Sequence, residues 1–140
     1  GLILSDGAPG IGCPVISSLS GVDAAVIVTE PTPSGRHDLK RVCGLCDHFR
    51  IPAGVVINKS DLNPNEAEAI ASFCRDKGHT MLGDIPHDRE FAKAMVNRLA
   101  VTEANCELIH AKIRSIWSGV LTLADSTKTK EPTIQLETRR

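Results

Sequence analysis

Short apolar runs alternate with stretches of helical periodicity along most of this 140-residue chain. Each apolar run is bounded by Gly, Pro or an acidic residue, and the runs cover residues 2–5, 24–29, 54–58 and 80–83. Apolar runs of this length are typical of strands that are buried on both faces, as in a parallel sheet. Helices are expected over residues 13–19, 34–49, 64–77, 88–99 and 102–123. The alternation predicts an α/β fold with right-handed β-α-β crossovers.

The stretch over residues 64–77 carries the clearest signals of a helix. Asn63 can cap its start, Pro64 suits its first turn, and Gly78 suits the left-handed turn that often ends a helix. Small and apolar residues recur on one face, which would pack on the sheet: Ala67, Ile70, Ala71 and Cys74. By the same capping rule, Ser34 is expected to cap the helix over residues 34–49.

Composition favours one small globular domain. Apolar residues make up 41% of the chain, and 16 Lys and Arg against 17 Asp and Glu leave a net charge of −1. This balance gives no electrostatic argument for a nucleic acid or a membrane as partner. No run approaches the ~18 apolar residues of a membrane helix and no basic leader opens the chain, so a cytoplasmic location is expected. Residues 1–124 are expected to form the folded domain, and the polar tail 125–140 to be disordered.

Polar loops follow all four predicted strands, and the carboxyl ends of parallel strands meet at one edge of a sheet. Residues 6–10 read Asp-Gly-Ala-Pro-Gly. Such an Asp can hold the hydration shell of Mg²⁺, and the Gly lets a backbone N–H approach a phosphate. Residues 58–61 read Asn-Lys-Ser-Asp and offer groups that suit the edge of a purine base. Taken singly, each loop also fits an ordinary turn.

The phosphate side of such a site is missing from the sequence, because the pattern Gly-x-x-x-x-Gly-Lys-[Ser/Thr] occurs nowhere in the 140 residues. Positioning and charge neutralisation of the phosphates supply most of the catalysis in phosphoryl transfer. The sequence therefore predicts only the magnesium and purine side of a nucleotide site. We expect this chain to have no ATPase activity by itself.

In their order and spacing, the segments 6–14, 26–33, 55–61 and 83–88 resemble the second half of a MinD/ParA-type P-loop ATPase. The similarity is greatest to the MinD-superfamily ATPases that carry an inserted ferredoxin domain, which are related to the Mrp and nitrogenase iron-protein families. It covers residues 2–99. The resemblance implies a partial P-loop NTPase fold, a mostly parallel sheet of about four strands flanked by helices that lacks the P-loop half.

The resemblance also implies roles for individual residues. Asp6 matches the acidic residue that holds Mg²⁺ through water, and Gly10 matches the glycine whose N–H senses the terminal phosphate. Asn58 matches the asparagine that contacts the base, while Pro86 and Asp88 fall in the loop that closes over the adenine. These roles predict ATP and Mg²⁺ as the cofactors.

Lys59 and Asp61 complete an Asn-Lys-x-Asp motif, with which GTPases select guanine. The family therefore implies ATP, whereas these residues alone leave GTP open. In the family, the first half of the domain brings the P-loop, and the full-length protein is expected to be a homodimer linked to iron–sulfur or electron-transfer chemistry. Two alternatives are an ATP-dependent amidating enzyme similar to cobyrinic acid a,c-diamide synthase, and a non-catalytic binding module.

Five cysteines bear on the iron–sulfur hypothesis. Cys43 and Cys46 fall on the apolar stripe of a predicted helix, which favours packing in the core over metal binding. Cys13 follows the phosphate-sensing loop and is the candidate ligand of a cluster shared between two chains. Its alternative role is that of a small residue that fits a tight loop.

Overall fold

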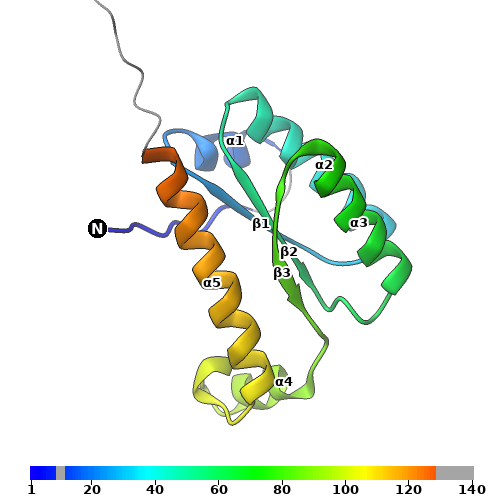
Figure 1. Cartoon of the computed structure of the whole chain (residues 1–140). Coiled ribbons are helices and arrows are strands. Elements are labelled where there is room, and N and C mark those ends of the chain that lie inside the picture. Colours follow the sequence, from blue (N-terminus) through cyan, green and yellow to red (C-terminus); the bar gives the residue numbers. More distant parts are fainter. Residues whose placement is uncertain (9–11, 129–140) are drawn as a thin grey trace, which may run out of the picture.

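The computed structural model describes residues 1–8 and 12–128, and within them three strands form one parallel sheet (Figure 1). The strands β1 (Ala25–Thr29), β2 (Ala53–Asn58) and β3 (Thr80–Ile85) lie in the order β1-β2-β3. Ala25 pairs with Ala53 and Gly54 with Thr80, and the second ladder shifts register between Val55 and Val56. The predicted α/β class and the parallel arrangement of the strands are confirmed.

Helices follow each strand and cover both faces of the sheet. α2 (Pro33–His48) and α3 (Pro64–Lys77) lie on one face, and α5 (Glu107–Lys128) crosses the other (Figure 1). α1 (Cys13–Leu19) precedes β1, while α4 (Arg89–Val96) and the 3₁₀ turn η1 (Val101–Glu103) connect β3 to α5. This layering places β2 at the centre of the domain, where its first five residues are buried.

The core between the sheet and α2 and α3 includes three cysteines. Cys43, Cys46 and Cys74 are no more than 1% exposed, and they pack with aliphatic residues of β2 and of the two helices. Burial raises the pKa of the Cys43 thiol to about 12, and burial likewise raises the pKa of the other two. The prediction that Cys43 and Cys46 pack in the core is confirmed.

Helix capping follows the sequence at α3 and departs from it at α2. The Asn63 side chain accepts a hydrogen bond from the Glu66 N–H at 3.2 Å, and Gly78 ends α3 in the left-handed conformation. At α2, the Thr32 hydroxyl accepts from the Gly35 N–H at 2.9 Å, so the expected cap at Ser34 is wrong. Thr32 has the extended backbone of a cap, and Pro33 then fills the first helical turn.

The expected strand over residues 2–5 is not formed. This segment has no regular secondary structure and its apolar side chains are exposed, Ile3 by 93%. A strand needs a neighbour for its backbone hydrogen bonds, and no described strand pairs with this segment. The sheet of the described residues therefore has three strands, one fewer than the sequence predicted.

The last predicted helix also starts later than expected. Residues 101–103 form η1, in which the Glu103 carboxylate accepts from the Ala100 N–H at 2.8 Å, and α5 begins only at Glu107. At its other end α5 continues through Lys128, with the Ser126 hydroxyl donating to the Leu123 carbonyl at 2.7 Å. The remainder of the predicted tail, 129–140, lies outside the described residues.

Close contact between α5 and the sheet depends on Gly54 of β2. A Cβ atom at this position would lie 2.5 Å from Leu82 Cδ1 and 3.0 Å from Leu123 Cδ2. Gly44, in the middle of α2, is exposed and has nothing within 4 Å of the same position.

These two glycines give a matched pair of substitutions with opposite outcomes. Gly54→Ala should lower the free energy of unfolding by roughly 1–3 kcal/mol, because the core must shift to admit the methyl group. Gly44→Ala should raise it by about 0.5–1 kcal/mol, because Ala is the better helix former. Urea unfolding monitored by circular dichroism measures both changes, and two changes of the same sign would contradict the packing of α5 on β2.

Candidate functional site

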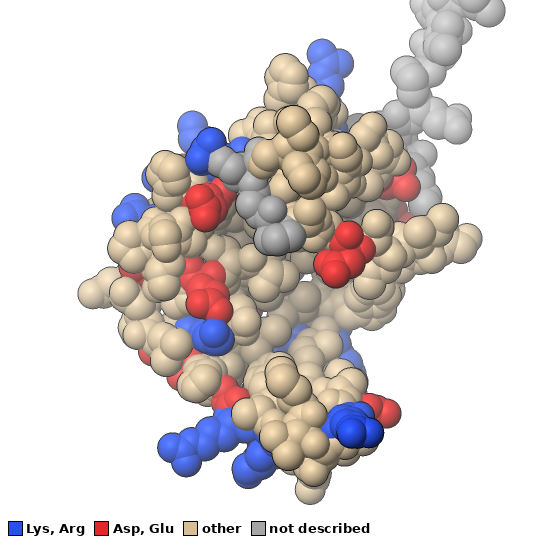
Figure 2. Space-filling view, turned by 180° about the vertical axis from the view of Figure 1, so that it is seen from behind, with Lys and Arg blue, Asp and Glu red and all other residues tan. Residues whose placement is uncertain are grey.

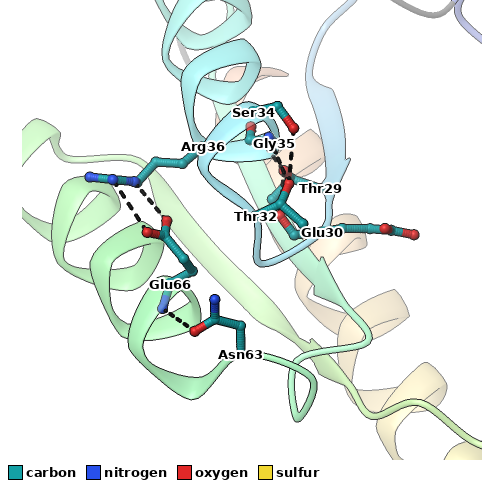
Figure 3. Close-up of polar contacts among 8 residues, drawn as sticks. All are labelled: Thr29, Glu30, Thr32, Ser34, Gly35, Arg36, Asn63 and Glu66. Atoms are coloured by element: carbon teal, nitrogen blue, oxygen red, sulfur yellow. Dashed lines mark hydrogen bonds and ion pairs between the residues drawn. The ribbon is translucent and has the colours of Figure 1, made fainter.

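The loop after β1 is held by hydrogen bonds among residues 29–35 (Figure 3). The buried Thr29 hydroxyl donates to the Gly35 carbonyl at 3.2 Å, next to the cap that Thr32 makes with the Gly35 N–H. A side chain at Gly35 would clash with the Glu30 carbonyl oxygen, so the loop closes tightly against the start of α2. Glu30 is left at the rim, with its side chain 48% exposed.

The loop after β2 is joined to the loop after β1 by an ion pair. The Lys59 ammonium lies 2.6 Å from the Glu30 carboxylate. Lys59 itself has a φ of 55°, and its N–H donates to the Asn58 side-chain oxygen at 3.1 Å. The end of β1 and the residues Asn58 and Lys59 after β2 therefore meet at one edge of the sheet, as the sequence predicted.

The loop after β3 is fastened to the loop after β2. The His87 N–H donates to the Asp61 carboxylate at 2.6 Å, and the Ser60 N–H donates to the Ile85 carbonyl at 3.0 Å. Asp88 caps α4 by accepting from the Glu90 N–H at 2.9 Å. Asp61 and Asp88, which the sequence predicted as ligand groups, thus hold backbone in place, and Pro86 is half-buried.

A second ion pair lies below this edge, between β3 and α5. Asp84 accepts hydrogen bonds from the Ser60 hydroxyl at 2.8 Å and from the Lys112 ammonium at 3.0 Å. Partial burial acts to raise the pKa of Asp84, but the two hydrogen bonds and the Lys112 charge outweigh it, so the pKa lies below its usual value. Asp84 therefore remains ionised and ties β3 to the Asn-Lys-x-Asp loop and to α5.

Arg36 is turned away from the strand ends and toward α3. Its guanidinium makes two contacts with the Glu66 carboxylate, at 2.9 and 3.4 Å (Figure 3). Glu66 in turn donates its N–H to Asn63, which caps α3. The pair joins the starts of α2 and α3, so Arg36 has a structural partner inside the domain.

A cavity of about 570 Å³ runs along β1 and reaches the edge at Glu30. Asp6, Gly7 and Ala8 line it together with every residue of β1. Figure 2 views the molecule from behind and shows a hollow near the middle of this side, surrounded mostly by uncharged residues. Asp6 is exposed and shares the cavity with Glu30, the partner of Lys59, whereas Gly10 lies outside the described residues.

The structure gives the position of Cys13, the predicted ligand of an iron–sulfur cluster, but no cluster of ligands around it among the described residues. Cys13 is exposed at the first residue of α1. Within residues 1–8 and 12–128, no three His, Cys, Asp or Glu residues form a group that could hold a metal ion. The same residues contain no helix that is both long and apolar enough to cross a membrane.

The sequence did not predict the partners of the site residues. Glu30 directly follows the predicted strand over residues 24–29, but its ion pair with Lys59 joins residues from separate crossovers. The contact of Asp84 with Lys112 likewise depends on where α5 crosses the sheet. No local pattern signals either pair, because both follow from the parallel register and the helix packing.

The chain is similar to two uncharacterized proteins of Methanocaldococcus jannaschii, MJ0578 and MJ0579. MJ0578 is 31% identical over 103 residues, which cover 74% of this chain and 34% of that protein. MJ0579 is 31% identical over 90 residues, which cover 57% of this chain and 34% of that protein. The chain thus spans about a third of the length of these relatives. No protein-family model matches the chain.

The contact of Asp61 with the His87 N–H predicts how the two loops respond to substitution. In Asp61→Ala, the His87 amide hydrogen should exchange with solvent about tenfold faster or more, because its acceptor is gone. Asp61→Asn keeps an oxygen acceptor and should have a smaller effect. Hydrogen exchange followed by NMR measures both rates, and equal rates in the wild type and Asp61→Ala would exclude this contact.

The lowered pKa of Asp84 predicts a pH-dependent stability. A carboxyl group whose pKa is lower in the folded state stabilises the fold above its unfolded pKa, near pH 4, and this contribution is lost as pH falls through the folded pKa. Lys112→Met should therefore be less stable than the wild type at pH 6, and the difference should shrink below about pH 4 as Asp84 is protonated. Urea unfolding between pH 6 and about pH 3 measures this difference in stability. Lys77→Met, a substitution of an exposed lysine, is the control. A difference that does not vary with pH would contradict the ion pair.

Proposed function

We propose that this chain forms the magnesium-and-purine side of the nucleotide site of a MinD/ParA-type switch ATPase. The observation that carries the proposal is the convergence of three loops at the carboxyl edge of a parallel sheet. The Glu30–Lys59 and Asp61–His87 contacts, each 2.6 Å long, tie these loops into one rim. Ligands of open α/β sheets bind at this edge because loops and helix starts converge there.

Asp6 and Asn58 are the residues that we assign to ligand contacts. Asp6 lines the same cavity as Glu30, and carboxylate oxygens are suited to Mg²⁺ and its water shell. The Asn58 oxygen is occupied by the Lys59 N–H, and its NH₂ group has no hydrogen-bond partner among the described residues. That NH₂ can donate to a ring nitrogen of a purine. Gly10 keeps its proposed role at the terminal phosphate.

The contacts of the motif residues favour adenine over guanine. Reading guanine through Asn-Lys-x-Asp needs the carboxylate to accept from the base, but one oxygen of Asp61 already accepts from His87. Lys59 is likewise paired with Glu30. We therefore assign ATP as the ligand and give Asp61 and Lys59 the role of holding the loops that surround the base, with Pro86 and Asp88 in the loop that closes over it.

Catalysis requires a phosphate-binding loop, and we assign that loop to another part of a longer, homodimeric protein. The relatives support this proposal, because the matched region is about a third of each of them. A link to iron–sulfur or electron-transfer chemistry in the longer protein remains part of the proposal, with Cys13 as the candidate ligand. Its exposed position at the start of α1 leaves it accessible to a second chain.

Nucleotide titration of the longer protein tests the proposal. With Mg²⁺ present, ATP should bind more tightly than GTP by calorimetry. Asn58→Ala should weaken ATP binding by about tenfold or more, since it removes a hydrogen bond to the base. Asn105→Ala, an exposed Asn on the loop before α5, is the matched control and should leave binding unchanged. The 140-residue chain alone should not hydrolyse ATP.

Each contrary result has a defined meaning. Tighter binding of GTP would replace the adenine assignment with the GTPase alternative. Failure of the folded longer protein to bind either nucleotide would reject the proposed function. Glutamine-dependent amide formation driven by ATP would favour the amidating-enzyme alternative.

A further inference from the structure

Lys59, in the loop after β2, has a left-handed backbone. Its φ is 55°, a conformation in which the Cβ atom of an L residue crowds the following carbonyl group. Residues other than glycine keep such a conformation only where the surrounding contacts hold them in it. The shape of the loop that begins at Asn58 therefore depends on contacts outside Lys59 itself.

Ser60 provides the contacts that hold this loop on β3. Its N–H donates to the Ile85 carbonyl at 3.0 Å, and its hydroxyl donates to Asp84 Oδ2 at 2.8 Å. Ile85 is also the residue that pairs with Asn58, so the chain leaves β2 at Asn58 and is bound to β3 again at Ser60. Lys59 alone lies between these two points of attachment and has to make the turn.

Lys112 of α5 fixes the carboxylate on which Ser60 depends. Its ammonium lies 3.0 Å from Asp84 Oδ2, the same oxygen that accepts from the Ser60 hydroxyl. The Asp84 side chain is 48% exposed, so burial alone does not fix its position. A hydrogen bond between two charged groups is stronger than a neutral one and limits where the carboxylate can lie. A chain of contacts thus runs from α5 through β3 to the left-handed Lys59.

The ion pair between Lys59 and Glu30 cannot take the place of these contacts. Its two side chains are 39% and 48% exposed, and exposed ion pairs between long side chains contribute little to stability. The pair also acts on the far end of the Lys59 side chain, whereas the hydrogen bonds of Ser60 act on the adjacent residue of the backbone. The left-handed turn therefore depends mainly on Ser60 and on the groups that hold it.

We propose that Lys112 is a positioning residue of the nucleotide site: through the Asp84 carboxylate it holds residues 58–61 in the strained conformation that binds the ligand. This role deepens the proposed function and rests on it for the identity of the ligand. Asn58, whose NH₂ group is assigned to the base, is the first residue of this loop. A loop that is held in its binding conformation before the ligand arrives loses less conformational freedom on binding, so the affinity is higher.

Hydrogen exchange of the Ser60 amide in the longer protein tests the hold on the loop. Lys112→Met should speed this exchange by about tenfold or more, because the loop opens more often once its tie to α5 is lost. Lys112→Arg keeps a cationic donor and should have a smaller effect. The amide of the buried Val55 in β2 reports opening of the whole domain and should change less than that of Ser60. Equal acceleration at both amides would mean general destabilisation and would overturn the proposal.

Glycine in place of Lys59 separates positioning from general stability. Glycine adopts the left-handed conformation without strain, so the loop should keep its shape with less help from α5. In the Lys59→Gly background, Lys112→Met should therefore change the Ser60 exchange rate by less than about threefold. Arg50→Gly is the matched control, because Arg50 also has a positive φ, 58°, but lies before β2. In that background the effect of Lys112→Met should remain about tenfold. Loss of the effect in both backgrounds, or in neither, would contradict the proposal.

ATP titration of the longer protein measures the consequence for the site. Relative to the wild type, Lys112→Met should weaken ATP binding by roughly threefold to tenfold, and Lys112→Arg should weaken it less. Equal ATP affinity in the wild type and Lys112→Met would overturn the positioning role. Failure of the longer protein to bind any nucleotide would reject the proposed function, and the exchange rates would still decide whether Lys112 holds the loop.

Discussion

Burial of β2 between two layers of helices is the constraint on which the rest of the structure depends. Val55, Val56 and Ile57 are 0–3% exposed, with α2 and α3 on one side and α5 on the other. A strand covered in this way must have neighbours for its backbone groups, and short helical crossovers make those neighbours parallel. The parallel arrangement brings the three strand ends to one edge. The polar contacts of Glu30, Lys59, Asp61 and His87 are possible only because of it.

The groups that look like ligands in the sequence also serve the architecture. Lys59, Asp61 and Asp88 each have a partner within the domain, and two of those partners are backbone N–H groups. Loops at a sheet edge must satisfy their own polar groups before they can present any to a ligand. Most of the charged groups at this edge therefore stabilise the conformation of the loops. Asp6 is exposed, and the Asn58 NH₂ group has no hydrogen-bond partner among the described residues.

Local signals in the sequence predicted local structure well. α1 and α3 have the expected bounds, because proline at their starts and the Asn63 and Gly78 caps of α3 fix the ends within a few residues. Residues 2–5 were predicted as a strand from their apolar character, but strand formation also needs a paired neighbour. The start of α5 was missed because Glu103 closes a separate turn with Ala100. The Glu30–Lys59 and Asp84–Lys112 pairs join distant residues and leave no local pattern, and Gly10 lies outside the described residues.

The three buried cysteines give the domain an internal reporter of its own opening. Only the thiolate reacts readily with alkylating reagents, and burial both shields Cys43, Cys46 and Cys74 and raises their pKa values. Cys13, by contrast, is exposed at the surface. Modification of the buried set therefore requires α2 and α3 to separate from the sheet. The rate at which the three buried cysteines are alkylated therefore measures how often this core opens. The rate for Cys13 measures only the reactivity of an exposed thiol.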